Sequence, residues 1–176
     1  MQELITAALA AGFSHAGIAP AAALEVRPEV RDMCNADKCR KWNRSWMCPP
    51  ACGTLEECAA RMQPFRCALV VQTTGELEDA YDYENMIGIG RRQKDTFRAF
   101  LPEVRRLCGE VLPLTSGGCD ECPTCTYPDA PCLHPETAMP SMEACGLMVS
   151  DSCTAAGLQY YYGEGTLTYT GCYLYK

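Results

Sequence analysis

The stretch CDECPTCTYPDAPC, residues 119–132, constrains the fold of this chain more than any other feature. It holds four cysteines within fourteen residues, and prolines stiffen the backbone between them. Thiols at this spacing are too close together to be scattered core residues, and they are badly placed to pair with one another as disulfides. The segment therefore predicts a loop that closes around an inorganic ligand, bound by Cys119, Cys122, Cys125 and Cys132.

The spacing C-x2-C-x2-C also favours one class of metal. It places three thiolates around one side of a bulky core, as iron–sulfur proteins do for three ligands of a cubane, and Cys132 closes the other side. Tetrahedral zinc more often takes two well-separated C-x2-C pairs. The sequence therefore predicts a 4Fe–4S cluster at this loop, with zinc as the alternative.

A second cysteine-rich segment, CNADKCRKWNRSWMCPPAC, precedes it in the chain. Another 4Fe–4S cluster is predicted there, with the ligands Cys34, Cys39, Cys48 and Cys52. The two prolines after Cys48 resemble the proline that follows a ferredoxin ligand. Cys58, in the helix that follows, is the alternative to Cys52 as the fourth ligand. If only three of these thiols bind, one iron is left open to substrate.

Length and composition show that the cysteines need a role of this kind. At 176 residues, the chain is expected to form a single domain, 1–176, that buries roughly two thirds of its unfolded surface without covalent cross-links. It contains 14 cysteines, and its start, MQELITAALAAGF, lacks the basic segment of a secretion signal. We therefore expect a cytoplasmic protein of an anaerobic or strongly reducing cell, with metal binding favoured over disulfides.

Charge and motifs exclude several function classes. The net charge of −7 argues against a nucleic-acid partner, because phosphate binding requires a basic face. No segment approaches the roughly 18 apolar residues of a membrane span, so no membrane partner is expected. No Ser-His-Asp, Cys-His-Asn or phosphate-loop pattern is present, and the catalytic residues stay unknown.

Helical and extended patterns alternate along the chain. Helices are predicted at 2–12, at 54–62 behind a capping box, at 84–108 with a kink or restart at Pro102, and after an N-cap at Ser141. Strands are predicted at 15–19, 67–73 and 111–114, and as a final antiparallel pair around Gly163-Glu164-Gly165. The fold class is α/β or α+β: a mixed β-sheet flanked by helices, with two cysteine-rich cluster-binding loops at about 34–58 and 119–132.

Other side chains near these loops have more than one interpretation. Trp42 and Trp46 either exclude water from a cluster or pack in the core. The roles of His134 and Glu143 stay open, although Glu143 is expected to cap its helix together with Ser141. The cysteines in apolar strands or on a helix stripe are predicted to be small buried hydrophobes: Cys67, Cys108 and Cys172.

Four motifs together carry a resemblance to a known family: RSWMCPP, GGC-x2-C-x2-C, PDAPCLHP and PSMEACGLMV. They resemble the cysteine-rich "predicted metal-binding protein" family, domain-of-unknown-function family 2284, from about residue 30 to the C-terminus. The resemblance implies a bound metal, with an iron–sulfur cluster favoured, and no particular reaction. Cys145, within PSMEACG, stands where an aromatic residue is expected and is interpreted as incidental.

The function predicted from these features is electron transfer by two 4Fe–4S clusters, to or from a redox protein partner. The alternative is a redox or Lewis-acid enzyme in which one open-site cluster acts on a small molecule. A third possibility is a zinc-stabilised interaction module. Eight cysteine ligands favour the carrier and seven favour the enzyme, while the cluster potentials and the oligomeric state are left open.

Overall fold

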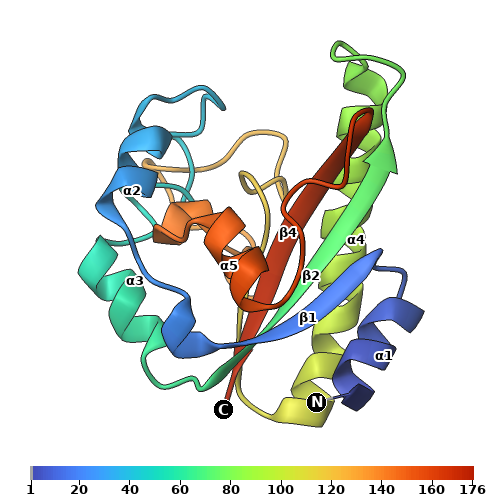
Figure 1. Cartoon of the computed structure of the whole chain (residues 1–176). Helices are drawn as coiled ribbons and strands as arrows, with labels where there is room; N and C mark the ends of the chain where they lie inside the picture. Colours follow the sequence, from blue (N-terminus) through green and yellow to red (C-terminus); the bar gives the residue numbers. More distant parts are fainter. Residues whose placement is uncertain (1) are drawn as a thin grey trace.

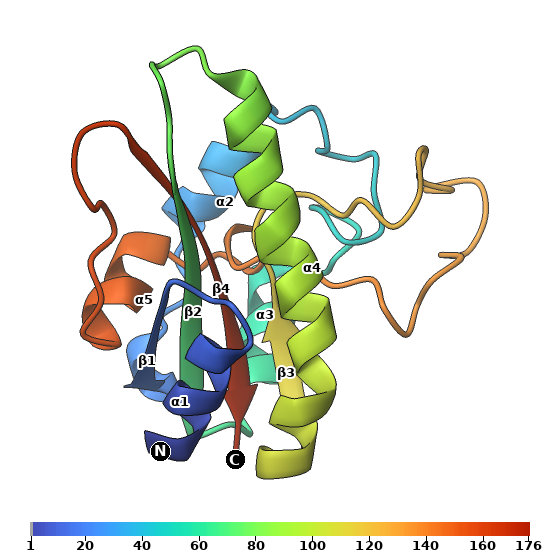
Figure 2. The same cartoon turned by 90° about the vertical axis from the view of Figure 1, so that its right-hand side faces the viewer.

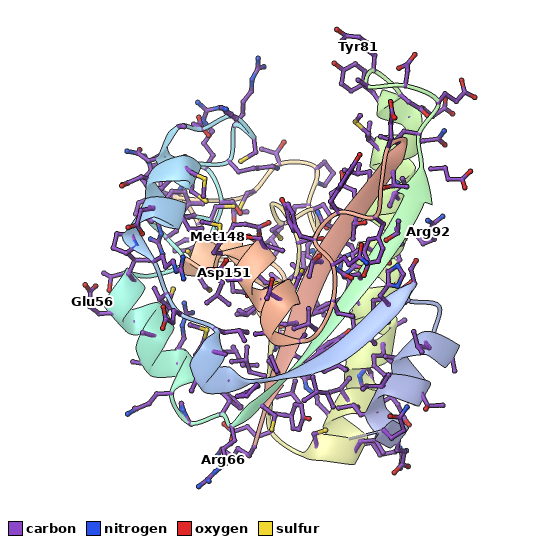
Figure 3. All side chains as sticks on the ribbon, viewed as in Figure 1. Glu56, Arg66, Tyr81, Arg92, Met148 and Asp151 are labelled. Carbon is purple, nitrogen blue, oxygen red and sulfur yellow. The ribbon has the colours of Figure 1, made fainter. Side chains whose placement is uncertain are left out.

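Four strands form one antiparallel sheet in the computed structural model, which describes residues 2–176 (Figure 1). The sheet order is β1-β2-β4-β3. The strands are β1 (His15–Pro20), β2 (Cys67–Glu76), β3 (Val111–Leu114) and β4 (Thr166–Tyr175). The longest pairing joins β2 to β4, in a register that runs from Cys67 opposite Tyr175 to Glu76 opposite Thr166. Figure 3 shows Arg66 and Tyr81 at opposite ends of β2, beyond which the chain turns away.

Helices cover both faces of the sheet. They are α1 (Gln2–Ala10), α2 (Pro28–Asn35), α3 (Leu55–Met62), α4 (Tyr83–Cys108) and α5 (Val149–Ala155), with short 3-10 turns η1 (Ala21–Ala23) and η2 (Glu143–Cys145). Helices α1 and α4 lie on one face, and α2, α3 and α5 lie on the other (Figures 1 and 2). Among the described helices, none has the length and apolarity that a membrane crossing requires.

A hydrophobic cluster lies on each face, because successive side chains of a strand point to opposite sides. Leu69 and Tyr173 pack against α1 and α4, whereas Val70 and Leu174 pack toward α3 and η2. The position of α4 over β4 depends on a glycine: a Cβ atom at Gly171 would lie 2.8 Å from the Phe97 ring. The hydrophobic cluster on the α3 and η2 side includes two cysteines, Cys58 and Cys145.

The α+β class is confirmed, but the expectation of a mixed sheet is wrong, because all the ladders are antiparallel. A strand–helix–strand order, here β2-α4-β3, usually places two parallel strands side by side. In this chain β4 lies between β2 and β3 and runs opposite to both. Helix α4 therefore connects two strands, β2 and β3, that are separated in the sheet by β4. The order of elements in the sequence does not reveal this separation.

Most predicted elements are confirmed within one or two residues. The capping box at Thr54 is present, with Glu57 N–H donating to Thr54 Oγ1 at 3.2 Å and Thr54 N–H donating to Glu57 Oε2 at 2.8 Å. The expected kink or restart at Pro102 does not divide α4, which continues as one helix from Tyr83 to Cys108.

The predicted final strand pair is wrong, because only β4 is a strand. Both edges of β4 are already taken by β2 and β3. The preceding segment instead satisfies a buried amide, since Gln72 Nε2 donates to Gln159 O at 2.9 Å and Tyr162 Oη donates to Gln72 Oε1 at 2.7 Å. Satisfying the buried side chain of Gln72 therefore fixes this segment as irregular structure.

Candidate metal centre

The cysteines after β3 are brought together by the fold. One small pocket is lined by all four of them, Cys119, Cys122, Cys125 and Cys132, which we call the second cysteine group. Each is half-buried. The other side of the pocket comes from the earlier loop and includes Ser45 and Trp46. The structure thus places side by side all four residues that the sequence nominates as ligands there, and their binding of a metal stays a prediction.

Helix α4 fixes the start of this loop. Lys94 Nζ donates to Gly118 O at 2.6 Å and to Asp120 Oδ2 at 3.1 Å. One helical turn later, Arg98 pairs with Asp120, and its Nε lies 2.6 Å from Glu121 Oε1. These two basic side chains pair with both carboxylates that follow Cys119, so the loop is anchored to helix α4.

Hydrogen bonds directed at sulfur act on the second cysteine group. Burial raises the pKa of Cys125, but hydrogen bonds from the backbone N–H of Tyr127 and Trp46 and from the Ser45 hydroxyl outweigh it, so the pKa is lowered. At Cys119, burial dominates and raises the pKa, opposed by the N–H of Glu121. Donors aimed at sulfur stabilise a thiolate, the form that binds metal.

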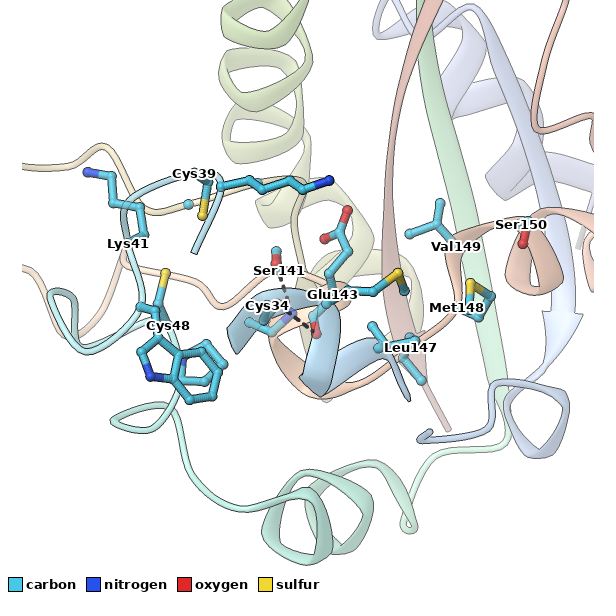
Figure 4. Close-up of a pocket in the computed structure, with 18 of the residues that line it drawn as sticks. Cys34, Cys39, Lys41, Cys48, Ser141, Glu143, Leu147, Met148, Val149 and Ser150 are labelled. Carbon is cyan, nitrogen blue, oxygen red and sulfur yellow. Dashed lines mark hydrogen bonds between the residues drawn. The ribbon is translucent and has the colours of Figure 1, made fainter. Parts of the chain in front are cut away.

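The earlier loop places three of its four predicted ligands around a larger space. A cavity of about 510 Å³ is lined by Cys34, Cys39 and Cys48, which we call the first cysteine group (Figure 4). Trp42 lines the same cavity, and neither Trp42 nor Trp46 belongs to the hydrophobic clusters on the sheet. The interpretation of the tryptophans as core residues is therefore wrong, and both lie beside cysteine groups.

Helix α2 carries Cys34 to the cavity. Pro28 occupies the first turn of α2, where its missing N–H costs nothing. Arg27 N–H donates to Gly146 O at 2.8 Å, which ties the start of α2 to the end of η2. Cys34 Sγ then donates to Glu143 O at 3.7 Å. Burial, followed by the nearby Glu143 carboxylate, raises the pKa of Cys34 to about 11.

Cys52 is directed elsewhere and does not line this cavity. It is buried with Cys58 and Cys145, and Cys52 Sγ donates to Ala144 O at 3.5 Å. Cys58 accepts hydrogen bonds from both neighbouring thiols and from Arg61, whose Nη2 lies 3.1 Å from Cys58 Sγ. Arg31 approaches the same sulfur at 3.8 Å.

These contacts define the charge of the three-thiol group. The hydrogen bonds from Cys145, Cys52 and Arg61 lower the pKa of Cys58, while donating to Cys58 raises the pKa of Cys52 and of Cys145. These hydrogen bonds therefore favour the thiolate form of Cys58 over that of Cys52 or Cys145. Cys145, interpreted from the sequence as incidental, is one of the two thiols that stabilise this form of Cys58.

The two cysteine-rich loops contact each other directly. Trp46 Nε1 donates to Ala130 O at 3.0 Å, and the rings of Trp46 and Tyr127 meet edge to face at 4.9 Å. At the cysteines themselves, Cys48 Sγ accepts hydrogen bonds from the Cys119 N–H and the Ser45 hydroxyl. The first and second cysteine groups therefore adjoin, with Ser45 between Cys48 and Cys125.

The short turn η2 contributes the one acidic side chain that lines the larger cavity. Ala144 N–H donates to Ser141 Oγ at 3.1 Å, but the N-cap position of this turn is Met142, so Ser141 contacts the turn without being its cap. Glu143 Oε2 is inaccessible to solvent and has no hydrogen-bond partner. Burial raises the pKa of Glu143, opposed by hydrogen bonds that include those from Ser141 and the Gly117 N–H.

The donor set at both groups is made of soft thiols, which suit iron or zinc. Within residues 2–176, no three Cys, His, Asp or Glu side chains meet closely enough to hold a single ion as they stand. A cubane takes its ligands on different irons, so its thiolates surround a larger volume than those of one tetrahedral ion, with metal–sulfur bonds of about 2.3 Å. The raised pKa values of Cys34 and Cys48 mean that binding there releases protons.

Several residues that contact the cysteines or their loops were not predicted from the sequence. The sequence does indicate that Lys94 and Arg98 act together, because their spacing of four residues places them on one helix face. Ser45 lies three residues before Cys48, within the motif RSWMCPP, but nothing local identifies its hydroxyl as a neighbour of both Cys48 and Cys125. Arg61 and Cys145 are brought together only by the tertiary fold.

A comparison of the sequence with known protein families covers the cysteines described above. Residues 18–175 match the family described as "Predicted metal-binding protein (DUF2284)", so the match includes every cysteine named above. No curated protein and no solved structure shows a significant match to the chain.

Proposed function

This chain belongs to the family of predicted metal-binding proteins, and from that premise we propose that it is an iron–sulfur protein carrying two 4Fe–4S clusters. We propose further that it exchanges electrons with a protein partner. The observation that carries the proposal is the convergence of Cys119, Cys122, Cys125 and Cys132 on one pocket. Four soft thiolates at ferredoxin-like spacing favour iron–sulfur chemistry over a hard cation.

The chain's own groups support a redox role. When bound, such a cluster supplies one-electron chemistry whose potential depends on hydrogen bonds to its sulfurs and on burial. The donors to Cys125 and Cys48, with Ser45 shared between them, are contacts of this type. Because the two cysteine groups adjoin at Cys48 and Cys119, they are suited to act as one redox unit.

A second function is favoured by the cavity at the first cysteine group. Its volume of about 510 Å³ falls in the range of small-molecule sites, and its lining is mostly apolar, including Trp42, Leu147 and Val149. Three cysteines, not four, reach it. This arrangement supports a redox enzyme that binds a small organic substrate beside the first group and receives electrons through the second.

The surface charge predicts how a partner docks. Between Leu107 and Tyr175 the chain contains no lysine or arginine, so the second cysteine group lies in an acidic segment. Two cubanes with four thiolates each would add about −2 apiece to the net charge of −7, whereas three thiolates at the first group would add about −1 there. A partner should therefore present a basic face, and complementary charge should accelerate the encounter.

We expect electron exchange with a basic protein to slow by at least about tenfold between 0.1 and 1 M salt, where the Debye length falls from about 10 Å to about 3 Å. The measurement is stopped-flow oxidation of the reduced protein by cytochrome c, with a neutral small-molecule oxidant as the control. A rate with cytochrome c that stays constant over this range, like the control, would count against docking through the acidic segment.

A further inference from the structure

The first cysteine group presents an incomplete set of thiols. Cys34, Cys39 and Cys48 line the cavity, and a cubane offers four irons to be bound. The residue nominated from the sequence to complete the set, Cys52, lies in a different environment. Its Sγ donates to Ala144 O at 3.5 Å and lies beside Cys58, to which Arg61 Nη2 donates at 3.1 Å. Moving Cys52 to the cavity would break this buried group.

A carboxyl group lines the same cavity as the three thiols of the first cysteine group. Figure 4 shows the Glu143 side chain projecting from η2 into the space between Cys39 and Met148. Glu143 lines the cavity together with the three thiols, and its backbone O accepts a hydrogen bond from Cys34 Sγ at 3.7 Å. The acid is thus attached to the same short turn that positions Cys34.

One oxygen of this carboxyl group is available for a ligand. Glu143 Oε2 is shielded from solvent and lacks any hydrogen-bond partner among the described residues. Lys38 and Lys41 also line the cavity, but neither forms an ion pair with Glu143 within residues 2–176. A buried polar atom without a partner is costly, so its presence beside three thiols calls for a bound group.

We infer that the Glu143 carboxylate, and not Cys52, is the fourth ligand of the first cluster. This inference rests on the proposed iron–sulfur function. An oxygen ligand is harder than thiolate and binds iron less firmly, so it is the ligand that an incoming molecule replaces most easily. An iron held by Glu143 would lie at this cavity, which Glu143 lines. Glu143 therefore marks the iron at which a small oxygen- or nitrogen-donor substrate binds.

The test compares single variants of the full-length protein, purified without oxygen. Glu143→Gln keeps the volume of the side chain, and Glu143→Cys replaces the oxygen ligand by a thiolate. Cys52→Ser removes the competing candidate. Glu56→Gln is the matched control, because Glu56 is exposed on α3 and points away from the cavity (Figure 3). The readouts are iron per chain and the EPR signal of an oxidised three-iron cluster.

We expect Glu143→Gln to lose about one of about eight irons and to show the three-iron signal after mild oxidation. Glu143→Cys should recover the full iron content without that signal, whereas Cys52→Ser and Glu56→Gln should match the wild type. Far-UV circular dichroism identifies any variant that fails to fold. If Glu143→Gln does not fold, the comparison of Glu143→Cys with Cys52→Ser decides between the two candidate ligands.

Two results would overturn the inference. One is a three-iron signal in Cys52→Ser with full iron in Glu143→Gln, and the other is full iron in both variants. Either leaves the proposed function standing, because the wild type still contains iron and sulfide. If the wild type itself contains only zinc, the proposed function fails, and the assignment of Glu143 fails with it.

Discussion

Replacement of Cys125 by alanine is expected to remove about half of the iron, or about four of about eight atoms per chain. Cys125 lines the pocket of the second cysteine group and receives more sulfur-directed hydrogen bonds than Cys119, from two backbone N–H groups and Ser45. Loss of one thiolate from a loop that the cluster holds together should also destabilise the fold, because metal binding and folding are coupled. Iron and sulfide analysis of the anaerobically purified variant measures the loss.

Cys108→Ala is the matched control for this variant. Cys108 ends α4, is half-buried, and packs against the hydrophobic cluster on the opposite face of the sheet. The variant should keep all its iron and lose about 1 kcal/mol of unfolding free energy, as for a small cavity. Full iron in Cys125→Ala together with reduced iron in Cys108→Ala would show that Cys108 is a ligand and that Cys125 is structural.

Replacement of Phe97 by alanine is expected to lower the free energy of unfolding by about 3–5 kcal/mol. Phe97 is fully buried, and its ring stacks on Tyr173 with centroids 4.0 Å apart. Its backbone O accepts a hydrogen bond from Tyr173 Oη at 2.7 Å, and its ring fills the space above Gly171. Truncation leaves a cavity between α4 and β4 that neither element can close.

Denaturant unfolding under anaerobic conditions measures this loss. Tyr161→Ala serves as the control, since Tyr161 is 60% exposed and should change stability by less than about 0.5 kcal/mol. The iron content of Phe97→Ala should equal that of the wild type, because Phe97 lines neither of the pockets that hold the cysteine groups. A loss of less than about 1.5 kcal/mol would mean that the contact between α4 and β4 is less important than its burial indicates.

Local patterns predicted most helices and strands, although they missed α2. The apolar stripe containing Phe97, Phe100 and Val104 marks the buried face of α4, and all three residues are buried. The capping box at Thr54 and the apolar run from Cys67 have near-neighbour causes that can be read from a few residues. Elements set by contacts within one or two turns were therefore predictable.

The order of the strands was not predictable in the same way. Insertion of β4 between β2 and β3 depends on contacts between segments about 60 to 100 residues apart. The segment before β4 is rich in aromatic residues, as strands are, yet it is used to satisfy the buried Gln72. The strand order and the irregular segment before β4 both depend on competition between segments distant in sequence. Local propensities do not reflect this competition.

The two cysteine groups differ in the same way, because local spacing sets one and long-range contacts set the other. The second group lies within fourteen residues, so its convergence follows from spacing alone, and the structure brings all four thiols to one pocket. The first group spreads over a longer loop, and its surroundings come from η2, about a hundred residues further along the chain. The position of Cys52 beside Cys58 and Cys145, and of Glu143 beside Cys34, is fixed by that long-range contact.

The most direct test of the central claim is the metal content of the wild-type protein. The protein is purified without oxygen and analysed for iron, acid-labile sulfide and zinc, and its visible absorption spectrum is recorded. We expect a brown protein with about eight irons and about eight sulfides per chain, in agreement with two cubanes. A colourless protein with stoichiometric zinc and no visible absorption would contradict the account and identify the chain as a zinc-stabilised module.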